Sequence, residues 1–212
     1  MGRDPLQTRH PAEHTLGMPA IRRRWTTAEV RSLMDESRAW PRYELIGGEL
    51  LVTPAPRGAH QLVVVELVVL LYEYLGREPV GTVVTSPADL ELQPGTITQP
   101  DIFVVPATTR PVGDQLEWSD VTSLLLAVEV LSPSSLRTDR VEKRDFYMDA
   151  KVAEYWVVDA DARIVERWTR ARETSVIVRD RLTWAPAGAE PLVIDLTALF
   201  DRVAVKLRML GR

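Results

Sequence analysis

Two segments decide how this chain folds: Gln99-Pro100-Asp101-Ile102-Phe103-Val104-Val105 and Leu124-Leu125-Leu126-Ala127-Val128-Glu129-Val130-Leu131. Each is an apolar run of strand type that carries one acidic side chain, Asp101 or Glu129. A carboxylate within such a run is costly to bury unless a positive group neutralises it. A lysine, Lys143, follows on a predicted helix. Two carboxylates and a lysine are the components of a divalent-metal site that cleaves phosphodiesters.

The pattern around these segments predicts strands interleaved with helices. Helices are expected over residues 26–34, 58–75, 136–150 and 196–200; strands are expected over 43–46, 49–52, 80–92, 97–105, 123–131, 153–159, 163–169, 174–178 and 192–194. Such a chain folds as an α/β sandwich, with a central sheet covered by helices on both faces. Residues 1–20 are predicted to be a disordered tail, and residues 21–212 a single domain.

Composition excludes several classes of protein. The chain is 45% apolar and 26% charged, as in ordinary soluble proteins, and no apolar run approaches the ~20 residues of a membrane helix. The absence of cysteine excludes disulfides, thiolate metal sites and a cysteine nucleophile, and a cytoplasmic location is expected. A net charge of −4 disfavours a protein that coats nucleic acid, but it allows a nuclease with local basic groups.

Both strand carboxylates also have structural interpretations. Asp101 follows Pro100 at the start of its strand, where an aspartate is often only a turn or cap residue. Glu129 lies inside an apolar strand, where a carboxylate needs a metal, an ion partner or a raised pKa. For Glu129 the alternative is an arginine partner with a purely structural role.

Lys143 is one helical turn from Asp139 and one from Tyr147, so the three side chains share a face of the predicted helix. Tyr147 indicates that this face touches the protein. The Lys143 ammonium could then lie over the strand ends that carry Asp101 and Glu129. The alternative is a solvated Asp139–Lys143 ion pair, worth roughly a few tenths of a kcal/mol.

Other side chains could complete the same site. His60 opens the helix over residues 58–75, where a histidine is commonly a cap or a surface group. Glu44 and Glu49 lie on either side of Gly47-Gly48, and Glu49 is preferred because Glu44 is expected to point outward from the hairpin. Candidates for phosphate contact lie on the helix over residues 136–150 and just beyond it: Arg137, Arg140, Arg144 and Lys151.

The decisive residues also occur in a specific order. They are Tyr43-Glu44-Leu45-Ile46-Gly47-Gly48-Glu49-Leu50, His60, Pro100-Asp101, Glu129-Val130-Leu131-Ser132-Pro133-Ser134, Asp139, Lys143, Tyr147 and Glu154-Tyr155-Trp156-Val157-Val158-Asp159. This combination resembles the Uma2 family (DUF820) of restriction-endonuclease-like bacterial proteins, in the PD-(D/E)XK nuclease superfamily, over about residues 25–200. The superfamily lysine expected two positions after the glutamate is Leu131 here. In the Uma2 pattern that lysine moves to the following helix, as Lys143.

The resemblance implies a restriction-endonuclease-like core, a mixed central β-sheet flanked by α-helices with a metal site at one edge. It implies that Asp101 and Glu129, with the Val130 carbonyl, hold Mg²⁺ or Mn²⁺, and that Lys143 is the site lysine. His60 or Glu49 would steady the attacking water or a second metal, and one metal or two are equally compatible. The expected protein is a metal-dependent endonuclease that acts on DNA as a homodimer, with residues 174–193 as a candidate interface.

Two other functions compete with this one. A catalytically inactive nuclease-fold module, for nucleic-acid binding or assembly, would tolerate replacement of Asp101, Glu129 or Lys143. A hydrolase of another class could also use a carboxylate–lysine cluster. The sequence contains no Gly-x-Ser-x-Gly, Walker A or His-Glu-x-x-His motif, so serine hydrolases, P-loop NTPases and zincins lack support.

Overall fold

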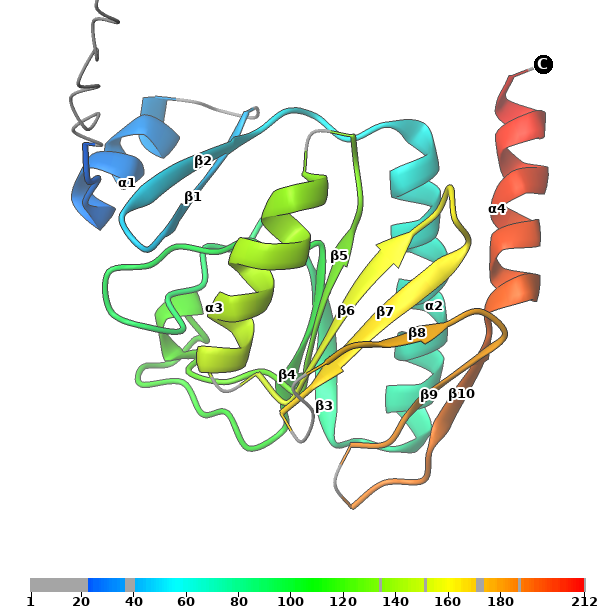
Figure 1. The fold of residues 1–212 in the computed structure, drawn as a ribbon. Helices are drawn as coiled ribbons and strands as arrows, with labels where there is room; N and C mark the ends of the chain where they lie inside the picture. The colour runs from blue at the N-terminus through cyan, green and yellow to red at the C-terminus, as the bar shows by residue number, and fades with distance from the viewer. Residues whose placement is uncertain are drawn as a thin grey trace, which may run out of the picture.

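A six-stranded sheet forms the centre of the computed structural model (Figure 1), which describes residues 23–36, 41–133, 135–150, 152–170, 174–186 and 188–211. The predicted tail over residues 1–20 and the candidate Lys151 lie outside the described residues. The strand order is β3 (Gly81–Thr85), β4 (Ile102–Pro106), β5 (Leu126–Val130), β6 (Glu154–Asp159), β7 (Ile164–Thr169) and β8 (Val176–Val178). Only β5 and β6 pair in parallel; the other neighbours are antiparallel. The sheet is therefore mixed, which confirms the prediction.

Helices cover both faces of this sheet, as the sequence predicts (Figure 1). On one face lie α2 (Gly58–Arg77) and α4 (Leu196–Leu210), which pack on the alternate residues of β4, β5 and β6 that point to that side. On the other face lie a π-helical turn (Thr138–Lys143) and α3 (Arg144–Asp149), packed on the remaining residues of the same strands. All residues of β5 are buried, because helices cover it from both sides.

A β-hairpin with its own short helix lies beside the main sheet (Figure 1). It consists of α1 (Thr27–Glu36), β1 (Arg42–Ile46) and β2 (Glu49–Thr53). Gly47 and Gly48 both have positive φ, +58° and +79°, which a two-residue hairpin turn requires. The hairpin is tied to the segment before β4, because the Leu45 N–H donates to the Ile97 carbonyl at 2.7 Å. This contact brings β1 close to the start of β4.

The strand predicted over residues 80–92 is shorter in the structure. β3 ends at Thr85, and Pro87 cannot donate a hydrogen bond to a continuing ladder. Residues 86–101 instead form an irregular segment held by the isolated bridges Leu45↔Ile97 and Leu90↔Thr98. The next ladder consequently begins at Ile102 rather than at residue 97.

The C-terminal part also contains more regular structure than predicted. Strand β9 (Arg181–Trp184), which the sequence analysis did not predict, pairs antiparallel with β10 (Leu192–Asp195) in a separate small sheet. Leu182 and Trp184 of β9 are buried in the core. The final helix continues from the predicted end at residue 200 to Leu210. Val203 extends the apolar spacing beyond residue 200, and it is buried.

Helix α2 is long and apolar enough to span a membrane by length and composition alone. Within the described residues it is a core helix, because one side packs on the central sheet and another on α4. Its buried Glu66 pairs with two cations of α4, Arg202 at 2.6 Å and Lys206 at 2.5 Å. These pairs fasten α4 to α2.

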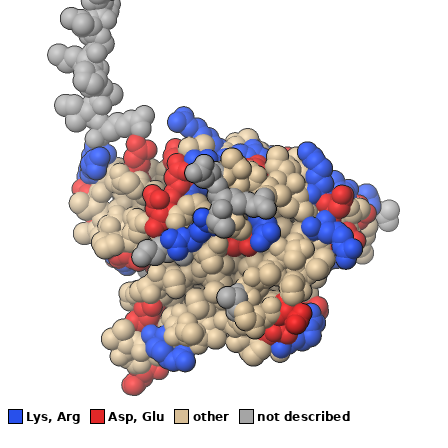
Figure 2. All heavy atoms as spheres, turned by 60° about the horizontal axis from the view of Figure 1, so that its bottom comes forward, with Lys and Arg blue, Asp and Glu red and all other residues tan. Residues whose placement is uncertain are grey.

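Charged side chains are interspersed on the face that Figure 2 turns forward. Small groups of Lys and Arg alternate with groups of Asp and Glu, and uncharged residues cover most of the area between them. This pattern agrees with the net charge of −4. Among the described residues, Lys and Arg form no broad continuous surface on this face.

Candidate active site

Asp101 is fixed at the junction of β4 and β5. It directly precedes β4 and follows Pro100, which has no N–H for a sheet ladder. The Asp101 side chain turns toward β5, where its Oδ2 accepts the Val130 N–H at 3.0 Å. The carboxylate is thus held at the end of β5, with only 8% of the residue exposed.

Two further side chains donate to Asp101. The His60 Nε2 lies 2.9 Å from Oδ2, and the Arg42 Nη1 lies 3.2 Å from Oδ1. Burial alone would raise the pKa of Asp101, but the hydrogen bond and charge of His60, the Val130 N–H and the Lys143 charge outweigh it. The pKa of Asp101 is therefore held below its ordinary value, and the group is a carboxylate at neutral pH.

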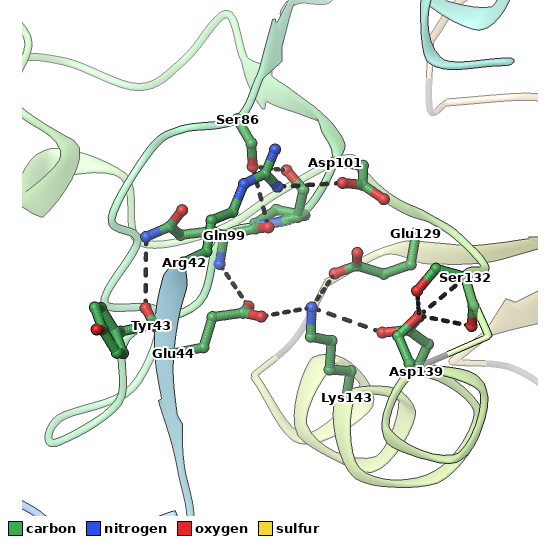
Figure 3. A network of polar contacts seen from close by, with 12 residues as sticks. Arg42, Tyr43, Glu44, Ser86, Gln99, Asp101, Glu129, Ser132, Asp139 and Lys143 are labelled. Carbon is green, nitrogen blue, oxygen red and sulfur yellow. Dashed lines mark hydrogen bonds and ion pairs between the residues drawn. The ribbon is translucent and has the colours of Figure 1, made fainter. Parts of the chain in front are cut away.

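Lys143 lies at the centre of a second group of carboxylates (Figure 3). Its Nζ is 2.9 Å from Glu129 Oε1, 2.8 Å from Glu44 Oε2 and 3.7 Å from Asp139 Oδ1. Glu129 Oε1 also accepts the Tyr147 hydroxyl at 3.1 Å. The predicted shared face of Asp139, Lys143 and Tyr147 is confirmed, and the alternative of a solvated surface pair is wrong.

The backbone that carries Lys143 is a single π-helical turn, Thr138–Lys143. Such turns are rare and often occur at functional sites. Both Asp139 and Lys143 are buried here, and the Asp139 carbonyl accepts the hydroxyl of Tyr155 at 2.9 Å. The turn therefore positions a lysine and an aspartate against the end of the sheet.

The electrostatics of this group are unusual. Burial lowers the pKa of Lys143, but Glu129, Glu44 and Asp139 reverse this effect, so the pKa lies well above its ordinary value and the ammonium stays charged. Burial raises the pKa of Glu129 well above its ordinary value, opposed by the Lys143 charge. Burial also raises the pKa of Asp139 to about 6, again against the Lys143 charge. The single Lys143 ammonium therefore does not neutralise all three surrounding carboxylates.

Most of the predicted site residues come together. Asp101, Glu129, Val130, Lys143 and His60 all line one cavity of about 340 Å³. His60 is not a surface cap, because it is buried against Asp101.

The preference for Glu49 over Glu44 is wrong. Glu49 lies at the tip of the hairpin, opposite Ile46, and is exposed, whereas Glu44 is buried and pairs with Lys143. The Gln99 N–H fixes Glu44 further by donating to its Oε1 at 2.8 Å. A signal was present in the sequence, because β2 leads through residues 54–57 directly into the helix of His60. The site must therefore lie near the end of β2 and the start of β1, away from the hairpin tip.

Two of the basic residues predicted for phosphate contact, Arg140 and Arg144, have other partners, whereas Arg137 is exposed. Arg140 pairs with Glu166 at 2.6 Å and with Asp159 at 2.9 Å, on the side of β6 and β7. Arg144 pairs with Asp145 and lies over the ring of Trp168. The cavity has a different cation at its mouth, Arg57, which precedes α2 and which the sequence analysis did not single out.

The donor atoms fit a hard divalent ion. Within the described ranges no three His, Asp or Glu side chains are grouped as a ready metal site, because the Lys143 ammonium lies among the carboxylates. Glu129 Oε2 accepts no hydrogen bond from any described residue, and Asp101 Oδ1 accepts one, from Arg42. Because a strand residue directs its N–H and its carbonyl to the same neighbour, the Val130 carbonyl is expected on the side of Asp101. Two carboxylates, one carbonyl and several waters are a suitable set for Mg²⁺.

This mixed sheet with flanking helices is the restriction-endonuclease-like core that the resemblance to Uma2 implies. A family model described as "Putative restriction endonuclease" matches residues 29–197, and the chain belongs to this family, Uma2. The fold is similar to the crystal structure of a protein from Anabaena variabilis ATCC 29413 described as "a putative nuclease belonging to DUF820". That similarity has a TM-score of 0.65 at 17% sequence identity, and it covers 82% of this chain and 98% of the other. No curated protein matches the chain.

Proposed function

We propose that this chain is a metal-dependent endonuclease that hydrolyses phosphodiester bonds in DNA with Mg²⁺ or Mn²⁺. The observation that carries the proposal is the convergence of Asp101, Glu129 and Lys143 at the base of one cavity. Membership of a nuclease family supports the reaction class. The metal is inferred from the donor chemistry of the cavity, and the DNA substrate from the description of the family as restriction endonucleases.

Each residue has a defined part in this proposal. The ion would be held by Asp101, Glu129 Oε2 and the Val130 carbonyl. It would lower the pKa of a bound water molecule and polarise the scissile phosphate. Arg42 and His60 orient the Asp101 carboxylate through its two oxygens. Lys143 is charged and stabilises the negative charge that develops on the phosphate. Tyr147 and Glu44 hold Glu129 and Lys143 in position.

The cavity mouth suits a phosphodiester backbone. The Arg57 side chain is exposed there and makes no ion pair with any described residue. It immediately precedes α2, whose N-terminus has no side-chain cap. A guanidinium beside a helix N-terminus without a side-chain cap favours the binding of an anionic oxygen. The Arg57 charge also compensates locally for the Asp101 and Glu129 carboxylates of the cavity.

Arg57→Ala is therefore expected to weaken DNA binding by a similar factor for all DNA sequences. Loss of one phosphate contact should reduce the slope of log affinity against log salt concentration by about one. Fluorescence anisotropy with a short duplex in EDTA, at several salt concentrations, measures this slope. Arg208→Ala, an exposed arginine on α4 outside the cavity, is the matched control and should leave the slope unchanged. Equal slopes in all three proteins would remove Arg57 from the interface.

The decisive test of the function is a metal titration coupled to a cleavage assay. We expect Mn²⁺ or Mg²⁺ to give a calorimetric binding signal with the wild-type protein and to activate cleavage of plasmid DNA. Single-stranded DNA and RNA, assayed in parallel, define the substrate. Absence of metal-dependent heat together with absence of cleavage on all three substrates would refute the proposal.

One observation favours a second function, a non-catalytic nucleic-acid-binding or assembly module with the nuclease fold. Lys143 is already paired with Glu129 and Glu44, so part of the acidic group is satisfied without a metal. Such a module would bind DNA equally well with Asp101→Asn or Glu129→Gln. Metal ions distinguish the two functions. An endonuclease needs them for cleavage, whereas the binding of DNA by such a module does not depend on them.

We further propose that the protein acts as a cytoplasmic homodimer. The support for a dimer is the exposure of apolar side chains within the region predicted as an interface, Ile177 at 56% and Val193 at 47%. Sedimentation equilibrium of the wild type and of Ile177→Glu tests this interface. A monomeric wild type at micromolar concentration would contradict the dimer.

A further inference from the structure

The Lys143 ammonium has the surroundings of a bound cation. Three carboxylates from separate elements face it: Glu44 from β1, Glu129 from β5 and Asp139 from the π-helical turn (Figure 3). The side chains of all four residues are no more than 6% exposed. When these carboxylates are ionised, their charge exceeds that of one ammonium. A divalent ion at this position would balance them better than the lysine does.

Asp139 shows that the position is incompletely filled. Its Oδ1 accepts no hydrogen bond from the described part of the chain, although its side chain is only 3% exposed. The 3.7 Å separation from Lys143 Nζ is too long for a hydrogen bond. A buried carboxylate oxygen without a donor is costly. Asp139 Oδ1 therefore faces the Lys143 ammonium at a distance too long for a hydrogen bond.

There is room for hydration around the position. The cavity of about 340 Å³ and a second cavity of about 170 Å³, which β2 also lines, both reach Lys143 and Asp139. Thr53, Ser135, Asp139 and Lys143 line both cavities. A shortened side chain at position 143 would leave space for water next to both cavities. Mg²⁺-like ions retain several waters in protein sites.

We infer that the Lys143 ammonium occupies a second cation position, and that a protein lacking this ammonium binds one divalent ion more than the wild type. The position differs from the proposed metal site, because Glu129 uses Oε1 toward Lys143 and leaves Oε2 for the other ion. The inference rests on the proposed function only for the first ion. In the native protein Lys143 then limits the site to a single divalent ion.

The test counts bound Mn²⁺ on the full chain by equilibrium dialysis and by electron paramagnetic resonance of free Mn²⁺. We expect one ion for the wild type and two for Lys143→Ala. Lys143→Arg retains the positive charge and should bind no additional ion. The double variant Lys143→Ala, Glu44→Gln removes a ligand of the new site and should lose the gained ion. If Lys143→Ala does not fold, Lys143→Gln, whose amide can still donate to two of the carboxylates, is counted instead.

Every outcome decides the question. A gain of one ion over the wild type supports the inference, and no gain overturns it. An equal gain in Lys143→Arg overturns it as well. The wild-type count alone reports on the proposed function: no bound ion in the wild type contradicts the metal site at Asp101 and Glu129, whatever the variants do.

Discussion

Asp101→Asn and Glu129→Gln are each expected to reduce metal-dependent cleavage of plasmid DNA by on the order of 10³-fold. A bound metal contributes several kcal/mol of charge stabilisation in such reactions, and each ~1.4 kcal/mol corresponds to a factor of ten in rate. The amides are nearly the same size as the carboxylates, so the change is mainly one of charge. Single-turnover cleavage rates with Mg²⁺ measure the effect.

The control for this experiment is Asp145→Asn on α3. Asp145 is an exposed carboxylate, 61% accessible and paired with Arg144, outside the cavity. Its substitution should leave the cleavage rate unchanged, and circular dichroism should show that all three variants are folded. Wild-type rates in Asp101→Asn or Glu129→Gln would show that these carboxylates do not hold a catalytic metal.

Lys143→Met is expected to cost about 3–5 kcal/mol in the free energy of unfolding at pH 8, because it leaves buried carboxylates without their cation. The cost should be smaller at pH 5. The folded-state pKa of Asp139 is raised from 3.8 to about 6, so below about 6 the folded protein binds a proton that the unfolded chain releases. The contribution of Asp139 to stability therefore falls as pH rises from about 4 to 6. Without the Lys143 charge this pKa rises further, so the fall in stability continues to higher pH.

Urea unfolding at pH 5 and pH 8 measures both effects. Lys206→Met is the matched control, because Lys206 pairs with Glu66 but is 46% exposed, and its loss should cost no more than about 1 kcal/mol at either pH. A Lys143→Met cost as small as that of the control, or one that is greater at pH 5 than at pH 8, would contradict the described charge distribution.

The sequence was sufficient for the fold class and for most of the cavity. Apolar runs with one embedded acid predicted buried strands, and the spacing of Asp139, Lys143 and Tyr147 predicted a shared face. The resemblance to Uma2 supplied the mixed sheet, which periodicity alone does not reveal. β3 and β4 are shorter than predicted. Pro87 cannot continue the ladder of β3, and the bridges around Leu90 hold the segment before β4 in an irregular conformation, which the local sequence pattern does not reveal.

Glu44 illustrates what local patterns do not determine. Its role depends on the backbone hydrogen bond between Leu45 and Ile97. This bond joins segments far apart in the sequence and fixes the hairpin against the segment before β4. His60 is similar, because only the fold brings the start of α2 against Asp101. The π-helical turn also has no counterpart in the helical periodicity of its sequence, although it positions both Asp139 and Lys143.

In the proposed function, Asp101 and Glu129 hold one cation beside Lys143. Anomalous diffraction from crystals of the wild-type protein soaked in Mn²⁺ tests it most directly. We predict one strong anomalous peak within about 2.5 Å of an oxygen of Asp101 and of Glu129 Oε2. Peaks confined to other parts of the surface, or a Mn²⁺ ion bound by neither carboxylate, would contradict this metal site.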